Sequence, residues 1–482
     1  MTTPTKPLLI GGRWVDGRAG LADVNPSDTS DVVAEFGCAD AALAQEAVEA
    51  AHHAHPEWAA ATPYRRFEVL DRAGSEVLAR AAEIGDLLAR EEGKTLGEAT
   101  AEATRAGQVL KFFAGEALRL TGDHVDSVRP GVEVVVTREP VGVVSVITPW
   151  NFPIAIPAWK IAPALAYGNT VVFKPAQLVP GCAWELADIL HRAGLPDGVL
   201  NLVVGAGRDV GSALTENPLI NAITFTGSQE TGEQVLRAAQ THHARVQLEM
   251  GGKNPLVVCD DADLQVAVDV ALQGAFGSTG QRCTASSRIV VMDSVHDRFV
   301  AALSDAMRAW VVDDARKPGT HMGPVVDASQ LQQDEEYVSV ARREGARVVG
   351  GRRLERGTDG FFLEPTLLVD TTNDMTVNRE EVFGPVASVI RVHDYDEAVR
   401  VANDTEFGLS SGIVTTSLAR ASHFRRASTA GMVMVNLPTA GVDFHVPFGG
   451  RRASSYGPRE QGSYAREFFT TVKTSYTAAG AP

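Results

Sequence analysis

VGVVSVITPWNFP, residues 141–153, carries a strong structural signal, because a solid apolar run ends abruptly in polar and turn-forming residues. The run at 141–147 is rich in valine and isoleucine, which predicts a strand buried on both faces. Beyond it, apolar runs such as NTVVF, AITFT and VQLEM alternate with helical segments up to residue 258. This rhythm is typical of βαβ units on a parallel sheet, so we expect an α/β fold.

The flanking segments extend this pattern. Residues 40–118 repeat apolar side chains at three- and four-residue spacing, which predicts amphipathic surface helices. A second α/β pattern resumes after residue 259, so two large domains are expected. The alternation in VEVVVTREP at 132–140 indicates an edge hairpin, and FFTTVKTSYT at 468–477 alternates like a strand that can add to another sheet, in this subunit or another.

The net charge and the distribution of apolar residues exclude several classes of protein. The chain has 482 residues and a formal net charge of -16, which argues against a general nucleic-acid or anionic-membrane binder. The N-terminus lacks a signal-peptide apolar region, and no window has the 18 or more apolar residues of a membrane-spanning helix. We therefore expect a cytoplasmic protein without nucleic-acid or membrane partners.

The four cysteines differ in their surroundings. None has CxxC spacing, so neither a disulfide framework nor a metal site is expected. Cys38, Cys182 and Cys259 are interpreted as buried small side chains. Cys283 lies instead in STGQRCTASS, among small polar residues that bury poorly, which makes it a candidate nucleophile.

Two glycine-containing loops are candidate phosphate sites. Gly205, Gly207 and Gly211 approach the dinucleotide fingerprint, but the last spacing is one residue too long, which favours a tight turn. At AITFTGSQETG a strand leads into Gly227 and Ser228 just before a helix. Spacing alone leaves two interpretations open there, an anion site at the helix N-terminus and an ordinary N-cap.

Polar residues follow three of the apolar strands. Asn151 follows the strand at 141–147, Lys174 ends VVFK, and Glu249 ends VQLE. Ligands of open α/β sheets bind at the carboxyl ends of strands. The set suits acyl-transfer chemistry, with a Cys283 thiolate attacking a carbonyl, the Asn151 amide meeting the oxyanion, and Glu249 acting as general base in place of histidine.

Six stretches in the same order resemble the motif series of the aldehyde dehydrogenase superfamily: TPWNFP, NTVVFKPAQ, FTGSQETG, LEMGGKNP, GQRCTASSR and EEVFGPV. They span residues 148–386, and the helices before them and the strand after them extend the resemblance to nearly the whole chain. The resemblance implies NAD(P)-dependent oxidation of an aldehyde to a carboxylic acid.

The resemblance also assigns catalytic roles. Cys283 would be the nucleophile, Glu249 the base that activates the thiol and the hydrolytic water, and Asn151 with the Cys283 backbone N–H the oxyanion hole. Attack of the thiol on the aldehyde would give a thiohemiacetal. Transfer of hydride to the nicotinamide would then give a thioester, and hydrolysis of the thioester would give the acid. The implied cofactor residues are Trp150, Lys174, Gln177, Gly207, Gly227, Ser228, Glu381 and Phe383.

The family fold implies two Rossmann-like α/β domains and a small β oligomerisation hairpin. The cofactor domain would comprise residues 1–120 and 141–248, and the catalytic domain residues 249–464. Residues 121–140 and 465–482 would form the oligomerisation element of a homodimer or homotetramer.

Gln177 departs from the common pattern of NAD-preferring members, which carry glutamate three residues after the lysine. A neutral side chain removes repulsion of a ribose 2′-phosphate. The cofactor is therefore expected to be NADP or NAD.

The substrate is predicted from a narrower resemblance. KPAQLVPGCAW, GQRCTASSR and the segment MVMVNLPTAGVDFHVPFGG resemble the α-ketoglutaric semialdehyde (2,5-dioxopentanoate) dehydrogenase group. The substrate's ω-carboxylate needs a cationic or donor-rich cradle, for which the candidates are Arg282, Ser286, Ser287 and His445.

Other functions remain open. An aromatic aldehyde such as benzaldehyde would suit a tunnel lined by Trp159, Phe276 and Phe444, and succinic semialdehyde is a further candidate substrate. A catalytically idle binding relative is another class, which the intact Cys283 and Glu249 argue against. Glu249 also argues against acylation of coenzyme A, because it serves hydrolysis in the family.

Overall fold

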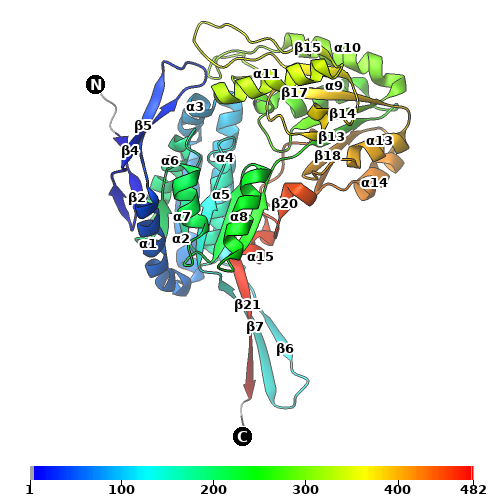
Figure 1. Ribbon diagram of the computed structural model, residues 1–482. Coiled ribbons are helices and arrows are strands. Elements are labelled where there is room, and N and C mark those ends of the chain that lie inside the picture. Colours follow the sequence, from blue (N-terminus) through cyan, green and yellow to red (C-terminus); the bar gives the residue numbers. More distant parts are fainter. Residues whose placement is uncertain (1–4, 479, 481–482) are drawn as a thin grey trace.

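The computed structural model describes residues 5–478 and 480, and its centre is the strand expected at 141–147 (Figure 1). This strand, β8, lies inside an eight-stranded sheet of order β20-β12-β11-β8-β9-β10-β2-β3. The strands β8 to β12 are parallel, whereas β2, β3 and β20 are antiparallel additions. The bounds are β2 (Leu8–Ile10), β3 (Arg13–Val15), β8 (Val143–Ile147), β9 (Thr170–Lys174), β10 (Leu200–Leu202), β11 (Ala222–Thr226), β12 (Arg245–Glu249) and β20 (Ser455–Tyr456).

The helices predicted at 40–118 are present, and α4 keeps an exposed face at Gly97, Ala101 and Gln108. The helix α4 packs against α2, α3 and α5, and its buried residues include Glu102 and Glu116. The burial of these two carboxylates is a feature that apolar periodicity alone did not predict. The bounds are α1 (Ala41–Ala60), α2 (Pro63–Ala79), α3 (Ala81–Glu92), α4 (Leu96–Ala117), α5 (Ala155–Ala166), α6 (Pro180–Arg192), α7 (Ser212–Thr215) and α8 (Gln229–Gln240).

The second α/β pattern forms a seven-stranded sheet of order β15-β16-β17-β14-β13-β18-β19. Only the edge strand β15 is antiparallel among these described strands. The strands are β13 (Asn254–Val258), β14 (Ser286–Met292), β15 (Arg347–Gly350), β16 (Thr366–Thr371), β17 (Val386–Val392), β18 (Ser410–Val414) and β19 (Met432–Val435). The helices are α9 (Leu264–Phe276), α10 (Asp293–Ala309), α11 (Ala328–Arg343), α12 (Thr376–Arg379), α13 (Tyr395–Asn403) and α14 (Leu418–Ala427).

A three-stranded arm projects from the body (Figure 1). It consists of β6 (Asp123–Asp126), β7 (Val132–Pro140) and β21 (Thr470–Ala478), with β7 in the middle. The terminal strand β21 therefore adds to the hairpin of its own chain, after the short helix α15 (Arg466–Phe469). A separate small sheet near the N-terminus contains β1 (Thr5–Lys6), β4 (Ala19–Val24) and β5 (Val32–Cys38).

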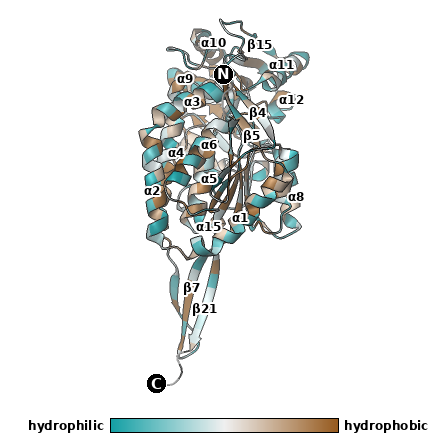
Figure 2. Cartoon of the chain, turned by 90° about the vertical axis from the view of Figure 1, so that its left-hand side faces the viewer, coloured by the Kyte–Doolittle hydropathy of each residue, from teal (hydrophilic) through white to brown (hydrophobic). Residues whose placement is uncertain are grey.

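Each large sheet has its own hydrophobic core. One cluster joins the first sheet to α1–α6, and another joins the second sheet to α9, α10 and α13. Figure 2 shows the enclosed strands in brown and polar residues on the outer helices. Among the described residues, no helix is both long enough and apolar enough to cross a membrane.

Candidate active site

The carboxyl ends of the parallel strands bring the predicted polar residues to one edge of the first sheet. Thr226 of β11 is the register partner of Glu249 at the end of β12. Ile147 of β8 is likewise opposite Lys174 at the end of β9. Because these strands run in the same direction, their polar ends share one edge, and the second sheet approaches it through the segment that carries Cys283.

Cys283 lies in the loop between α9 and β14, and neighbouring residues hold its backbone in place. The Asn254 side-chain amide donates to the Cys283 carbonyl at 2.7 Å and to the Ala285 carbonyl at 2.9 Å. A Cβ on Gly252 would lie 2.8 Å from the Cys283 carbonyl oxygen, so this close approach requires glycine. The loop before Cys283 contains Ser278 and Thr279 at positive φ angles of 49° and 57°.

Asn151 lies beside this loop with its side chain buried. Its Nδ2 atom donates to the Gln281 carbonyl at 2.9 Å. An amide nitrogen carries two hydrogens, so a second one is left to donate. The Cys283 N–H donates to no backbone carbonyl in the described part of the chain. These two donors can meet a negative oxygen formed next to the sulfur.

Glu249 belongs to a buried acidic cluster. It accepts a hydrogen bond of 2.5 Å from the Ser455 hydroxyl. Glu460 lies in the same cluster, ion-paired with Lys160 and accepting from the Trp159 indole at 2.7 Å. Burial, and then the Glu460 carboxylate, raises the pKa of Glu249 well above its usual value, against the opposing effect of Ser455. Glu249 therefore ionises at higher pH than an exposed glutamate does.

The thiol of Cys283 is also held in its protonated form. Burial raises its pKa, and the carboxylates of Glu381 and Glu249 add to the effect. The thiolate thus needs a base to take its proton or a positive charge beside it. This requirement agrees with a base such as Glu249 rather than with a spontaneously ionised cysteine.

A cavity of about 340 Å³ opens onto Cys283. Two cations line it, Arg282 and Arg105. Arg105 comes from α4, and one of its guanidinium nitrogens donates to the Val442 carbonyl. Aromatic side chains cover part of the wall, namely Phe152, Trp159 and Phe448. Two carboxylates, Glu98 and Glu102, line it as well. The cavity therefore combines an apolar wall with charged groups of both signs next to the nucleophile.

The predicted substrate residues differ in where the structure places them. Arg282 lines the cavity, although its guanidinium donates to the carbonyls of Gln273 and Gly274. Ser286 lies buried on β14 and hydrogen-bonds Thr439 at 2.7 Å. Ser287 lines a small pocket beside Glu381, and His445 is exposed outside the cavity. The strand register of β14 directs both serines elsewhere, so only Arg282 of the four lies at this cavity.

Three of the predicted cofactor residues, Trp150, Glu381 and Phe383, come from the segments around Asn151 and EEVFGPV. The rings of Trp150 and Phe383 meet edge to face, with centroids 5.5 Å apart. Glu381 accepts from the Gly252 N–H at 2.8 Å, and burial raises its pKa to about 7. A Cβ on Gly251 would lie 1.9 Å from a Glu381 oxygen, so the glycine makes room for this carboxylate.

The other predicted cofactor residues lie along the first sheet. Burial lowers the pKa of Lys174 to about 8. Gln177 lines a hollow of about 780 Å³ that also contains Arg18, Cys38 and Arg208. Gly207 begins a short π-helical turn at Gly207–Gly211, in keeping with the tight turn favoured for that loop.

The loop at 227–228 shows the expected cap. Ser228 caps α8 by accepting from the Thr231 N–H at 3.3 Å, while the Gly227 N–H donates to the Glu249 carbonyl at 3.1 Å. The N-cap interpretation is thus realised. An N-cap leaves other N–H groups of the first turn free, so anion binding stays a prediction.

Several site residues were missed by sequence reasoning, namely Arg105, Glu102, Asn254, Ser455, Lys160 and Glu460. The sequence held a signal for three of them. Glu102 and Arg105 are charged residues three positions apart on a helix with apolar neighbours, and Asn254 belongs to the motif LEMGGKNP. The others come from segments whose position depends on how the two domains pack.

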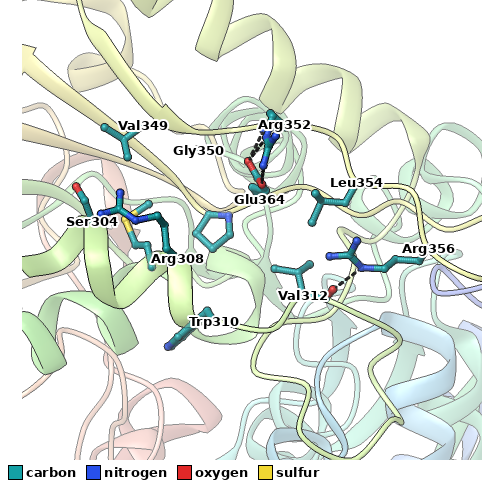
Figure 3. Close-up of a pocket in the computed structure, with 12 residues that line it drawn as sticks. Ser304, Arg308, Trp310, Val312, Val349, Gly350, Arg352, Leu354, Arg356 and Glu364 are labelled. Carbon is teal, nitrogen blue, oxygen red and sulfur yellow. Dashed lines mark hydrogen bonds and ion pairs between the residues drawn. The ribbon is translucent and has the colours of Figure 1, made fainter.

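A separate hollow of about 660 Å³ lies between α10 and the β15–β16 edge (Figure 3). It contains none of the predicted site residues. Its Arg352 is paired with Glu364 at 2.7 Å, and Arg356 donates to the Val312 carbonyl at 2.7 Å. The hollow contains neither the candidate nucleophile Cys283 nor the candidate base Glu249, so it is not a second candidate active site.

Known proteins share both the sequence and the fold. The profile of the Aldehyde dehydrogenase family matches residues 14–475. The chain is 42% identical to the alpha-ketoglutaric semialdehyde dehydrogenase of Bacillus subtilis over 97% of each chain. It is 44% identical to the alpha-ketoglutarate semialdehyde dehydrogenase of Haloferax volcanii over 99% of each. It is similar to the solved betaine aldehyde dehydrogenase of Staphylococcus aureus in complex with NAD+, with a TM-score of 0.96, 32% identity, and coverage of 99% of this chain and 96% of that chain. The expected α/β fold is thereby confirmed.

Proposed function

Because this chain belongs to the aldehyde dehydrogenase family and is an oxidoreductase, we propose that it oxidises α-ketoglutaric semialdehyde to 2-oxoglutarate. The observation that carries the substrate assignment is the pair Arg105 and Arg282 at the wall of the Cys283 cavity. Two relatives above 40% identity carry this substrate in their names. Guanidinium groups are well suited to hold the distal carboxylate of such an aldehyde.

The covalent steps belong to Cys283. Its thiolate attacks the aldehyde carbon, and the carbonyl electrons move to oxygen, giving a thiohemiacetal alkoxide. The Asn151 amide and the Cys283 N–H donate to this oxygen. Loss of hydride converts the adduct into a thioester, and attack by water releases the acid and the thiol.

Glu249 supplies the base. In its ionised form it takes the thiol proton, directly or through a water molecule, and later takes a proton from the hydrolytic water. Its raised pKa means that the ionised form, which acts as the base, needs a higher pH than an exposed glutamate would need. We therefore assign to Glu249 the fall of kcat at low pH.

The residues present fit a dinucleotide, and we assign NADP or NAD as the cofactor. The nicotinamide end would lie by Glu381, Trp150 and Phe383, and the adenosine end by Lys174 and by the hollow that contains Gln177. Gly227 and Ser228 would contact the pyrophosphate, and Gly207 would lie in the adenine pocket. When bound, the oxidised cofactor accepts the hydride. The neutral side chain of Gln177 in this hollow supports acceptance of a 2′-phosphate.

The domain division and the assembly follow the family pattern in this proposal. Residues 1–120 and 141–248 form the cofactor domain, and residues 249–464 form the catalytic domain. One strand of the catalytic segment, β20, pairs with the sheet of the cofactor domain. Residues 121–140 and 465–482 are the oligomerisation element of a homodimer or homotetramer, and its strands β6, β7 and β21 form the arm that contacts a second copy. Residues 479, 481 and 482 of this element lie outside the described residues. Exposed apolar side chains on the arm, Val472 and Tyr476 among them, support this role.

A second candidate substrate is an aromatic aldehyde. Phe152, Trp159 and Phe448 line the cavity, and they offer flat apolar surface for a ring. Of the aromatic residues expected to favour this substrate, Trp159 lines the cavity, whereas Phe276 is a buried core residue beside Trp310.

Initial rates of NAD and NADP reduction test the proposal with a panel of α-ketoglutaric semialdehyde, succinic semialdehyde, glutaraldehyde, benzaldehyde and propanal. The expected result is the highest kcat/KM for α-ketoglutaric semialdehyde, with loss of turnover in Cys283→Ala and retention in the control Cys259→Ala. Preference for benzaldehyde would leave the mechanism standing and remove the carboxylate cradle. An absence of turnover with all five would overturn the proposed reaction.

A further inference from the structure

Lys94 and Glu102 form a buried ion pair beside the segment that carries Asn151. Their Nζ and Oε2 atoms are 2.6 Å apart, and the side chains are 1% and 2% exposed. Lys94 lies in the short connection between α3 and α4, and Glu102 lies in α4. Burial alone would lower the pKa of Lys94, but the carboxylates of Glu102 and Glu92 outweigh it and raise this pKa, so the ammonium group keeps its charge.

This pair holds both ends of the segment 151–155. The Lys94 ammonium also donates to the Asn151 carbonyl at 2.8 Å and lies 3.9 Å from the centroid of the Phe152 ring. The other Glu102 oxygen accepts from the backbone N–H groups of Ile154 and Ala155, each at 3.2 Å. The pair therefore fixes the backbone at Asn151 and again three to four residues later.

Glu102 takes the place of a missing helix cap. The N-cap residue of α5 is Ile154, which has no side-chain oxygen and makes no capping hydrogen bond. The first N–H groups of a helix have no partner within it, and negative charge near them is favourable. The carboxylate of α4 thus sets the start of α5 and, with it, the direction in which the chain leaves Asn151.

Fold stability alone does not account for this arrangement. Removing two charges from water is unfavourable, and packed apolar residues of similar volume often replace a buried ion pair without loss of stability. Apolar residues could not hold the Asn151 carbonyl or the two N–H groups of α5. The directional contacts are what the charged pair adds.

We propose that Lys94 and Glu102 are positioning residues that aim the Asn151 amide at the reacting oxygen. This inference rests on the proposed role of Asn151 as an oxyanion donor. The Gln281 carbonyl holds the side-chain amide of Asn151, and the Lys94 ammonium holds the backbone carbonyl of the same residue. Loss of the Lys94 contact frees the backbone, and small misplacements of a catalytic group reduce the rate strongly.

The variant Lys94→Met tests the proposal with the aldehyde of the panel that the unmodified enzyme oxidises fastest. We expect kcat to fall by about 10- to 100-fold, while KM changes little, because the contact matters for the charged transition state. Alkylation of Cys283 by iodoacetamide, which needs no oxyanion donor, should keep its rate. Lys111→Met is the matched control, since Lys111 lies within α4 and pairs with the more exposed Asp71.

A double-mutant cycle with Asn151→Ala separates positioning from general structural damage. If Lys94 acts through Asn151, then Lys94→Met should add no further loss of kcat to Asn151→Ala. Additive losses, or an unchanged kcat in Lys94→Met, would overturn the proposal. Full activity of Asn151→Ala would instead overturn the oxyanion role assigned under the proposed function, and the inference with it.

Glu102→Gln covers the case in which Lys94→Met does not fold. The amide keeps the volume and one acceptor oxygen for α5 but loses the charge that holds Lys94. The same cycle with Asn151→Ala then decides the question, and a non-additive loss of kcat is again the expected result. Thermal midpoints of the single variants accompany the rates, so that a folding defect is recognised as such.

Discussion

The hydroxyl of Ser455 donates a 2.5 Å hydrogen bond to Glu249, and the two residues are register partners in the antiparallel pair of β20 and β12. The C-terminal part of the chain thus returns to the first sheet and contacts the proposed base. The relationship is electrostatic as well as structural, because this hydrogen bond opposes the burial that raises the pKa of Glu249.

Ser455→Ala should move the acidic limb of the rate profile to higher pH. Loss of the donor leaves the Glu249 carboxylate less stabilised, so its pKa rises further and ionisation requires a higher pH. A hydrogen bond to a charged group corresponds to a shift of about one pH unit. The measurement is kcat against pH at saturating cofactor, with the exposed Ser463→Ala as control. A limb that stays in place would show that another group controls it.

Arg105→Leu should lower kcat/KM for α-ketoglutaric semialdehyde by about 10- to 100-fold, since a charged hydrogen bond to the substrate carboxylate is lost. Propanal has no carboxylate, so its kcat/KM should hardly change. Arg105→Lys, which retains the charge, should recover part of the activity. Equal losses for both aldehydes would mean that Arg105 supports the site only through its contact with the Val442 carbonyl.

Gln177→Glu should weaken NADP binding by about tenfold or more, because a carboxylate beside the ribose repels a 2′-phosphate. NAD binding should be retained or improved, since a carboxylate can accept hydrogen bonds from the free ribose hydroxyls. Titration of each reduced cofactor by fluorescence gives both dissociation constants. Unchanged NADP affinity would contradict the proposed role of Gln177, and Gln177→Met serves as a neutral control.

Substitution of the arm's apolar face should reduce the mass of the assembly. Val472 and Tyr476 are 55% and 62% exposed and lie on the same face of β21, where a second copy would cover them. The double variant Val472→Asp with Tyr476→Asp should therefore sediment as a smaller species than the unmodified protein. Tyr64→Asp, at an exposed aromatic residue of α2, should leave the sedimentation unchanged. An unaltered mass in the double variant would show that the arm does not hold the assembly together.

Much of the fold was predictable because its signals are local. Valine-rich runs such as 143–147 predict strands wherever they occur, and the alternation with helices predicts parallel pairing. The helix α4 shows the limit of this reasoning. Its apolar spacing indicated an amphipathic helix, but contacts with α2, α3 and the sequence-distant α5 also bury the carboxylate of Glu102, which the spacing did not predict.

The order of residues was sufficient to identify Cys283, Asn151, Lys174 and Glu249 as one candidate set. Asn151, Lys174 and Glu249 lie at or just after the carboxyl ends of parallel strands of the first sheet, so local patterns imply that these three converge. Cys283 precedes β14 of the second sheet, and only the packing of the two sheets brings it to the same edge. The family resemblance of the six motifs rests on the same short segments.

Which residues line the substrate cavity depends instead on how segments distant in sequence pack together. Ser286 and His445 stand in suggestive stretches, yet the register of β14 directs Ser286 to Thr439, and His445 remains exposed. Arg105 reaches the cavity because α4 packs beside the Cys283 loop, and Ser455 reaches Glu249 because β20 crosses to the first sheet. Local sequence specifies backbone type and strand ends, whereas side chains from separate elements meet only where the two cores pack against each other.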